Sequence, residues 1–260
     1  MTTGARSERL DVEVLADAAA LADAAAERIV AAAERAIGAS GRCVIALSGG
    51  SAPRRTYERL AREPLNSRIS WASVHVIWGD ERCVAPDDAD SNYHMACESL
   101  LEHVPVPAAN IHRIHGEVDP GTAAASYEQL LRGLLETPSG APSVAAGRRI
   151  DLALLGLGDN GHTASLFPES TAASERVRWV VAESVDARPS WRITLTAPVL
   201  NAAAEILFLV SGREKAGVLS RVLDGPRVPR ELPAQLIEPA HGRVHWMIDR
   251  AAAMELARAQ

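Results

Sequence analysis

The chain has 260 residues and a mass of 27.7 kDa, enough for one large α/β domain or two small ones. Hydrophobic residues make up 47% and charged residues 23%, a globular composition that excludes an intrinsically disordered chain. The net charge is −6 and no basic run occurs, which argues against a nucleic-acid partner. An anionic ligand would therefore have to be met by a local cluster of donors.

Cysteine usage and hydropathy indicate a cytoplasmic protein. Cys43, Cys83 and Cys97 form no C-x-x-C pair, which suits a reducing compartment and excludes a disulfide framework. The N-terminus lacks an apolar signal core, and the longest apolar runs are only as long as a strand. We therefore expect neither secretion nor contact with a membrane.

The first half of the chain alternates apolar runs with helical patterns. Its predicted elements are a helix over 15–37, a strand over 43–47, a helix over 53–62, a strand over 74–78, and helices over 91–103 and 121–135. Residues 137–149 are rich in Pro, Gly, Ser and Ala and predict a surface linker.

The second half repeats this alternation. Its predicted strands are 150–155, 177–182, 191–195, 205–210 and 244–248. Its predicted helices are a short one that Pro168 stops, one over 213–223, and a closing helix that ends at 258. Strands that alternate with helices predict a mostly parallel sheet covered on both faces, in a single α/β domain.

Four loops with unusual composition each follow a predicted strand. They are 48–51, 79–82, 156–162 and 211–215. In open parallel sheets the ligand lies at the carboxyl ends of the strands. We therefore expect these loops to converge on one site.

Three of these loops suit an anion. The Gly-Gly pair within 48–51 lets the backbone approach a phosphate closely at the start of a helix, although most isolated Gly-Gly turns are tight turns with a serine cap. Arg82 offers a fork of donors, and Lys215 is the only lysine among 27 basic residues. For both cations, simple exposure to solvent is the alternative.

His162 is the best catalytic candidate because it follows a glycine-rich turn and titrates near neutrality. A structural histidine is the alternative. Residues 156–161 also match G-x-G-x-x-G, with Glu183 at the distance of a ribose contact, but His162 and the early Pro168 argue against a dinucleotide site. No H-E-x-x-H or comparable set occurs, so we expect no metal.

Five motifs together carry a resemblance to a known family. In chain order they are VIALSGGSAPRRTYERL (44–60), WGDER (78–82), DSNYHMA (90–96), LLGLGDNGHTASLFPES (154–170) and FLVSGREKAGVL (208–219). They resemble the 6-phosphogluconolactonases of the glucosamine-6-phosphate isomerase/6-phosphogluconolactonase superfamily. The combination of SGGS, DER and GHTASLFP is specific, whereas no single motif would be.

The resemblance implies one domain over residues 1–260, a Rossmann-like three-layer α/β/α sandwich with a mostly parallel central sheet. It implies hydrolysis of 6-phospho-D-glucono-1,5-lactone to 6-phospho-D-gluconate in the oxidative pentose phosphate pathway, without cofactor or metal. The sugar phosphate is then the expected small-molecule partner. The oligomeric state stays open, and a monomer is compatible with the sequence.

The resemblance also implies roles for residues. His162 would be the base that activates water, with Arg82 and Asn160 beside it in the catalytic set. The residues expected to bind substrate or its phosphate are Ser48, Gly49, Gly50, Ser51, Arg82, Ser91, Asn92 and Lys215. The family usually has an acidic residue where this chain has Asn160. Either Asp159 takes over that role, or the base is weaker than usual.

Two other functions stay open at this stage. A sugar-phosphate isomerase or deaminase of the same superfamily resembles a pattern with tyrosine and a carboxylate at the positions of Arg82 and Phe167. A non-catalytic sugar-phosphate sensor would need a helix-turn-helix module and a basic face. The first 40 residues offer only one alanine-rich helix, with balanced charge.

Overall fold

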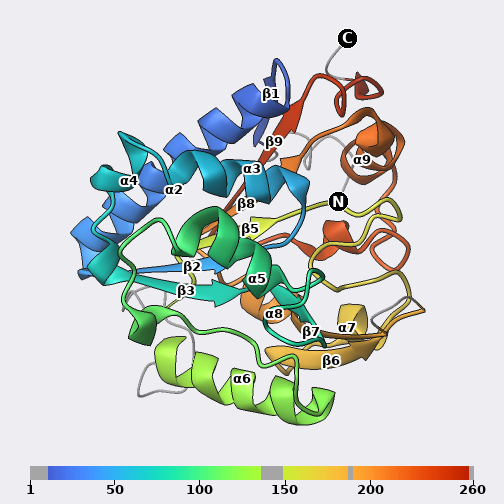
Figure 1. Ribbon diagram of the computed structural model, residues 1–260. Coiled ribbons are helices and arrows are strands. Elements are labelled where there is room, and N and C mark those ends of the chain that lie inside the picture. The colour runs from blue at the N-terminus through green and yellow to red at the C-terminus, as the bar shows by residue number, and fades with distance from the viewer. Residues whose placement is uncertain (1–10, 136–148, 187–189, 258–260) are drawn as a thin grey trace.

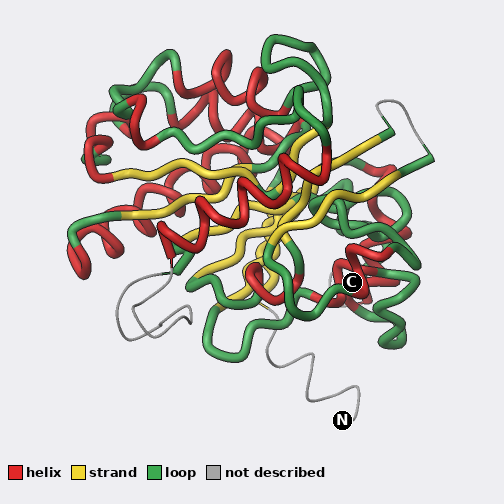
Figure 2. Tube along the Cα trace, turned by 90° about the horizontal axis from the view of Figure 1, so that it is seen from below, coloured by secondary structure: helices red, strands yellow, loops and turns green. Residues whose placement is uncertain are grey.

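A computed structural model describes residues 11–135, 149–186 and 190–257, and its core is a parallel sheet of six strands. The strand order is β1-β9-β8-β5-β2-β3, and all five pairings are parallel. The strands are β1 (Asp11–Leu15), β2 (Cys43–Leu47), β3 (Val74–Trp78), β5 (Leu152–Leu155), β8 (Glu205–Val210) and β9 (Arg243–Asp249). Figure 2 shows them running side by side with helices on both sides.

The middle of this sheet follows from three apolar runs. Every residue of β2, β5 and β8 is buried, and nearly all of them are aliphatic or aromatic. Strands covered on both faces read as continuous apolar runs, whereas β1 at the edge keeps exposed carboxylates. The carboxyl ends of β2, β5 and β8 therefore meet at one edge of a rigid core.

Helices pack on both faces of the sheet. Above it in Figure 1 lie α2 (Ala18–Ser40), α3 (Ser51–Leu60) and α4 (Leu65–Arg68), and below it lies α6 (Pro120–Leu135). The α2 helix begins at Asp17, whose carboxylate accepts the N–H groups of Ala19 and Ala20, and ends at Gly41 with φ of 76°. The arrangement confirms the predicted α/β fold with a mostly parallel central sheet.

A second, antiparallel sheet lies beside the carboxyl ends of the central strands. Its order is β4-β7-β6, with β4 (Asp80–Arg82), β6 (Val180–Ser184) and β7 (Trp191–Leu195). The sequence predicts only a turn over 79–82, and this is wrong, because Asp80 pairs with Thr194 and Arg82 with Arg192. Pairing between segments so distant in the chain leaves no local pattern in a three-residue strand.

The remaining elements are short. They are α5 (Asn92–Ala96) with a π-helical turn (Cys97–Leu101), α7 (Thr171–Ser174), α8 (Ala197–Leu200), α9 (Ala216–Leu223), and 3-10 turns at Trp71–Ser73, Ala108–Asn110, Arg213–Lys215 and Pro233–Leu236. The predicted helix over 213–223 is confirmed, as the 3-10 turn Arg213–Lys215 followed directly by α9. The predicted helix over 91–103 is shorter than expected.

Three further predictions are wrong or fall outside the description. No helix forms over 163–168, because Ala164 and Glu169 have positive φ of 47° and 58°, which a right-handed helix does not allow. Residues 250–255 form turns instead of a closing helix, and β1 was not predicted. Most of the predicted 137–149 linker lies outside the described residues. None of the described helices is long and apolar enough to cross a membrane.

Candidate active site

The four loops meet at a cavity of about 890 Å³ at the carboxyl ends of the central strands. The loop after β2 contributes Ser48–Ser51, β4 contributes Arg82, and the loop after β5 contributes His162. The loop after β8 contributes Ser211 and Lys215. The structure thus brings together the residues named by the sequence, with the exception of Ser91.

The loop after β2 presents a buried hydroxyl. The Tyr57 hydroxyl donates to the Ser48 carbonyl and accepts the Ser48 N–H, both at 3.0 Å, so the Ser48 backbone is fixed from α3. The Ser48 side chain is 5% exposed, and its Oγ has no hydrogen-bond partner within the described residues. Gly50 has φ of 106° and immediately precedes the first turn of α3. The loop Ser48–Ser51 therefore brings the start of α3 and a buried hydroxyl, which has no partner among the described residues, to the wall of the cavity, as an oxyanion ligand requires.

Asn92 packs directly against this loop. A Cβ atom at Gly49 would lie 2.0 Å from Asn92 Oδ1, so only glycine fits there. The Asn92 amide also donates to the Asp80 carbonyl at 2.9 Å, and its backbone N–H donates to Glu81 at 2.7 Å. Asn92 therefore lines the cavity and links β4 to the loop after β2.

Ser91 lies behind the site instead of in it. Its hydroxyl donates to the Glu81 carboxylate at 3.1 Å and accepts the N–H of His94 at 3.1 Å, which caps α5. Burial raises the pKa of Glu81, and the N–H bonds from Asn92, Arg82 and Tyr93 act against that rise. Among the described residues that line the cavity, Ser91 is not found.

The His162 ring is oriented by Asn160. Asn160 Oδ1 lies 2.6 Å from Nδ1 and also accepts the His162 backbone N–H at 3.2 Å. Because a backbone N–H can only donate, the Asn160 atom is the acceptor, so Nδ1 carries the proton of a neutral ring. Nε2 then keeps its lone pair, and it has no hydrogen-bond partner within the part of the chain that the structure describes.

The His162 ring packs against Gly158, where any residue with a side chain would collide with it. A Cβ atom at Gly158 would lie 1.9 Å from His162 Cε1. Gly161, with φ of 83°, closes the turn by donating to the Gly158 carbonyl at 2.9 Å. The Phe167 ring covers the imidazole at a centroid distance of 4.5 Å. These contacts hold the imidazole at the mouth of the turn.

Burial lowers the pKa of His162, and nearby charges act in both directions. Asp80 and Asp159 raise it, whereas Lys215 and Arg192 lower it further. The net direction favours the neutral imidazole, which is the form that accepts a proton.

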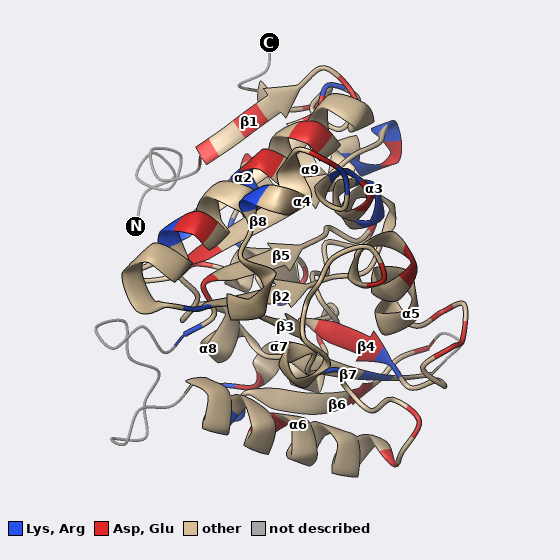
Figure 3. Cartoon of the chain, turned by 60° about the vertical axis from the view of Figure 1, so that its left-hand side comes forward, with Lys and Arg blue, Asp and Glu red and all other residues tan. Residues whose placement is uncertain are grey.

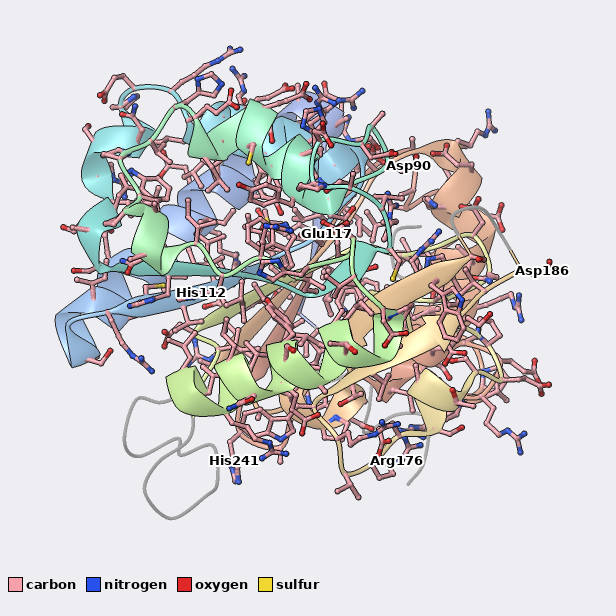
Figure 4. The ribbon with its side chains drawn as sticks, turned by 60° about the horizontal axis from the view of Figure 1, so that its bottom comes forward. Asp90, His112, Glu117, Arg176, Asp186 and His241 are labelled. Atoms are coloured by element: carbon pink, nitrogen blue, oxygen red, sulfur yellow. The ribbon has the colours of Figure 1, made fainter. Side chains whose placement is uncertain are left out.

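Two cationic groups border the cavity. The Lys215 ammonium pairs with the exposed Asp159 carboxylate. The group that contacts Nδ1 of His162 is therefore the Asn160 amide and not the Asp159 carboxylate. The Arg82 guanidinium donates to the Asp90 carbonyl at 2.5 Å. Figure 4 shows Asp90 and the cavity-lining Asp186 on the same side of the molecule, whereas His241 lies far from both.

The sequence analysis missed Arg192 of β7. It stands opposite Arg82 in the antiparallel pair β4–β7 and lines the same cavity. Figure 3 shows the basic tip of β4 beside the basic segment of β7. Burial, followed by the charge of Arg82, lowers the pKa of Arg192. Two arginines at opposite positions of paired strands place two positive charges beside the cavity and favour an anion there, and only the unforeseen pairing of β4 with β7 reveals this.

The glycine-rich turn does not open a dinucleotide-binding helix. Residues 161–170 are turns and an isolated bridge between Thr163 and Leu166. Glu183 does not reach out to a ribose, because it accepts the Thr171 hydroxyl at 2.8 Å and the Ala172 N–H at 2.6 Å. Within the described residues, no group of three or more metal-ligating side chains could hold a metal ion.

Comparison with known proteins identifies the family. The profile of the glucosamine-6-phosphate isomerases/6-phosphogluconolactonase family matches residues 16–246. The chain belongs to this family. A 6-phosphogluconolactonase of Nostoc sp. is 39% identical over 247 residues, which cover 95% of this chain and 98% of the relative. A 6-phosphogluconolactonase of Haemophilus influenzae is 36% identical over 80% of this chain and 85% of its own.

Solved structures of the family share the fold. The 6-phosphogluconolactonase from Trypanosoma cruzi superposes with a TM-score of 0.81 at 28% identity, covering 95% of this chain and 97% of that one. The 6-phosphogluconolactonase from Thermotoga maritima gives a TM-score of 0.78 at 27% identity, with 93% and 100% covered. A monomeric glucosamine-6-phosphate deaminase, at 23% identity, shares the fold alone.

Proposed function

We propose that this protein hydrolyses 6-phospho-D-glucono-1,5-lactone to 6-phospho-D-gluconate. The observation that carries the proposal is the His162 imidazole, whose Nδ1 proton is bound by Asn160 and whose Nε2 meets no hydrogen-bond partner among the described residues. It borders a cavity that Ser48 and Lys215 also line. Relatives 36–39% identical over most of the chain, which are named for this activity, support a lactone-hydrolysing enzyme.

The proposed chemistry needs one proton acceptor and no covalent enzyme intermediate. Nε2 of His162 takes a proton from water while the water oxygen bonds to lactone C1, and the carbonyl electrons move to its oxygen. When the tetrahedral intermediate collapses, the bond between C1 and the ring oxygen breaks. The imidazolium returns its proton to the ring oxygen, which leaves as a hydroxyl group of the product.

The cavity offers donors for both negative charges of the reaction. We assign the dianionic phosphate to the loop Ser48–Ser51, Lys215 and Arg82, because unpaired N–H groups and cations suit phosphate oxygens. We assign stabilisation of the oxyanion at C1 to a backbone N–H of the same loop or to Arg82. Loss of one such donor typically costs about 10²–10³ in rate. Arg192 adds a further cation beside Arg82.

Positioning is the second source of rate. The phosphate lies far from C1 in the substrate, so its binding energy can hold the lactone carbonyl beside His162. Asn92 borders the same space, and we assign it to substrate binding, whereas Ser91 supports it through Glu81. No cofactor takes part in the proposed reaction.

The proposed setting is the oxidative pentose phosphate pathway in the cytoplasm. Cys43, Cys83 and Cys97 are free thiols, which suits a reducing compartment. We further propose that one domain carries the whole activity, since the family match spans residues 16–246.

The direct test compares two sugar phosphates. Incubation with 6-phosphogluconolactone should release acid faster than the spontaneous hydrolysis in an enzyme-free sample. Incubation with glucosamine-6-phosphate should release no ammonia, because the apolar Phe167 beside His162 cannot exchange a proton. Ammonia release without acceleration of lactone hydrolysis would favour the isomerase or deaminase. Binding of both sugar phosphates without turnover would favour a sensor.

A further inference from the structure

Asp249 ends β9, next to the loop that follows β8, and its carboxylate holds that loop. Oδ2 accepts the Ser211 hydroxyl at 2.6 Å and the Gly212 N–H at 3.1 Å. Oδ1 accepts the Gly212 N–H at 3.2 Å and the Ala252 N–H at 2.7 Å. Asp249 is 4% exposed, and each of its two carboxylate oxygens accepts two hydrogen bonds.

The turn held in this way leads directly to Lys215. Gly212 has φ of 106°, a conformation that favours glycine, and the 3-10 turn Arg213–Lys215 begins immediately after it. The Lys215 N–H donates back to the Gly212 carbonyl at 3.1 Å. Ser211 and Lys215 border the cavity, whereas Asp249 is not among the described residues that line it.

We propose that Asp249 is a positioning residue, which fixes the Lys215 ammonium for the phosphate of the substrate. The inference rests on the proposed function, in which Lys215 binds that phosphate. Asp249 touches neither substrate nor reacting atoms, and it acts through the Ser211–Gly212 turn.

The physical reason lies in the length of the lysine side chain. Four methylene groups separate the ammonium from the backbone, so its mean position depends on where the Cα atom is held. A buried carboxylate that accepts several hydrogen bonds is a strong anchor, because its loss removes the acceptor of the buried Ala252 N–H and of the half-buried Gly212 N–H. The turn would then relax, and Lys215 would lose its fixed direction.

The test measures phosphate binding in a double-mutant cycle on the full chain. Asp249→Ala, Lys215→Ala and the double variant are compared for the inhibition constant of inorganic phosphate, for KM and for kcat. Asp249→Ala should weaken phosphate binding and raise KM by about tenfold, with kcat within about threefold of the wild type. In the Lys215→Ala background the same substitution should change the phosphate constant by less than about twofold.

Two further variants separate positioning from loss of folding. Asp249→Asn keeps one acceptor oxygen for the N–H groups, so it should fold and weaken phosphate binding by only a few fold. Asp151→Ala removes a half-buried carboxylate just before β5, at the amino ends of the strands, where it accepts the Val44 N–H at 2.7 Å. It should lower the melting temperature and leave phosphate binding unchanged.

The single lysine gives a direct spectroscopic readout. A protein labelled with ¹³C at lysine Cε carries one labelled side chain, Lys215. Its signal should shift on addition of phosphate in the wild type and in Asp151→Ala, and should be weaker or unresponsive in Asp249→Ala. If Asp249→Ala folds poorly, Asp249→Asn carries the same comparison.

The outcomes distinguish the two claims. If Lys215→Ala binds phosphate as the wild type does, the phosphate role of Lys215 fails, and the positioning role falls with it. If Lys215→Ala weakens binding but the Asp249 variants do not, only the positioning inference is overturned. An equal loss from Asp249→Ala in both backgrounds would also overturn it, because Asp249 would then not act through Lys215.

Discussion

A single oxygen of Asn160 accepts two hydrogen bonds from His162, one from Nδ1 at 2.6 Å and one from the backbone N–H at 3.2 Å. The second bond identifies the atom as an acceptor, and the first therefore fixes the tautomer of the ring. An uncharged amide thus orients the imidazole of His162. Asp159 cannot share this role while it pairs with Lys215.

Asn160→Asp tests what the missing charge does. A carboxylate beside Nδ1 favours the imidazolium, so the pKa of His162 should rise by about one unit. The base is active only when neutral, so activity is present above this pKa and is lost as the pH falls through it. The acid limb of the pH profile of kcat should therefore move to higher pH. A profile that does not move would mean that residue 160 does not contact the working imidazole.

The charges around His162 predict shifts in opposite directions. Lys215 lowers the pKa of His162, so Lys215→Ala should raise it, whereas Asp80 raises that pKa, so Asp80→Asn should lower it. Titration of the His162 ring protons by NMR measures both shifts without the background of substrate ionisation. Shifts of the same sign in the two variants would contradict this arrangement of charges.

Gly158→Ala should disable the site through sterics alone. The new Cβ atom would lie 1.9 Å from His162 Cε1, so the ring must leave its place. We expect kcat to fall by about 10²-fold or more, because a displaced imidazole can no longer accept a proton from the attacking water. Gly156→Ala in the same loop is the matched control, because its Cβ atom meets nothing within 4 Å. Equal losses in the two variants would indicate a general effect on the loop.

Arg192 should contribute to phosphate binding beside Arg82. Arg192→Gln removes one of two arginines that are cross-strand partners in β4 and β7. KM should rise by about tenfold, because a tenfold loss of affinity corresponds to the free energy of one hydrogen bond to a charged group. Added phosphate should also raise the melting temperature of the variant less than that of the wild type. An unchanged KM and an equal thermal shift would exclude a role for Arg192.

The sequence predicts the convergence of the four loops, because each follows a strand of a parallel sheet and such strands end at the same edge. Ser48–Ser51, Arg82, His162 and Lys215 meet for this reason. The parts that it does not predict depend on contacts distant in the chain. Arg192 lines the cavity only because β7 pairs with β4, and Asp249 holds the Ser211–Gly212 turn from a different strand.

Local backbone shape limits the prediction in one more place. The segment after His162 has helical composition, yet positive φ at Ala164 and Glu169 makes it an irregular loop. That irregularity places Phe167 against the imidazole. Ser91 is a second example. Its motif predicts a residue that binds substrate, but its hydroxyl accepts the His94 N–H and caps α5.

The most direct test of the central claim is the turnover of 6-phosphogluconolactone by His162→Ala, measured together with the inhibition constant of inorganic phosphate. Removal of a general base should lower kcat by about 10²–10⁴-fold. Phosphate inhibition of the residual activity should stay within about twofold of the wild-type value, because the phosphate ligands are intact. His241→Ala, an exposed histidine far from the cavity, should match the wild type in both. If His162→Ala keeps the wild-type kcat, His162 is not the base.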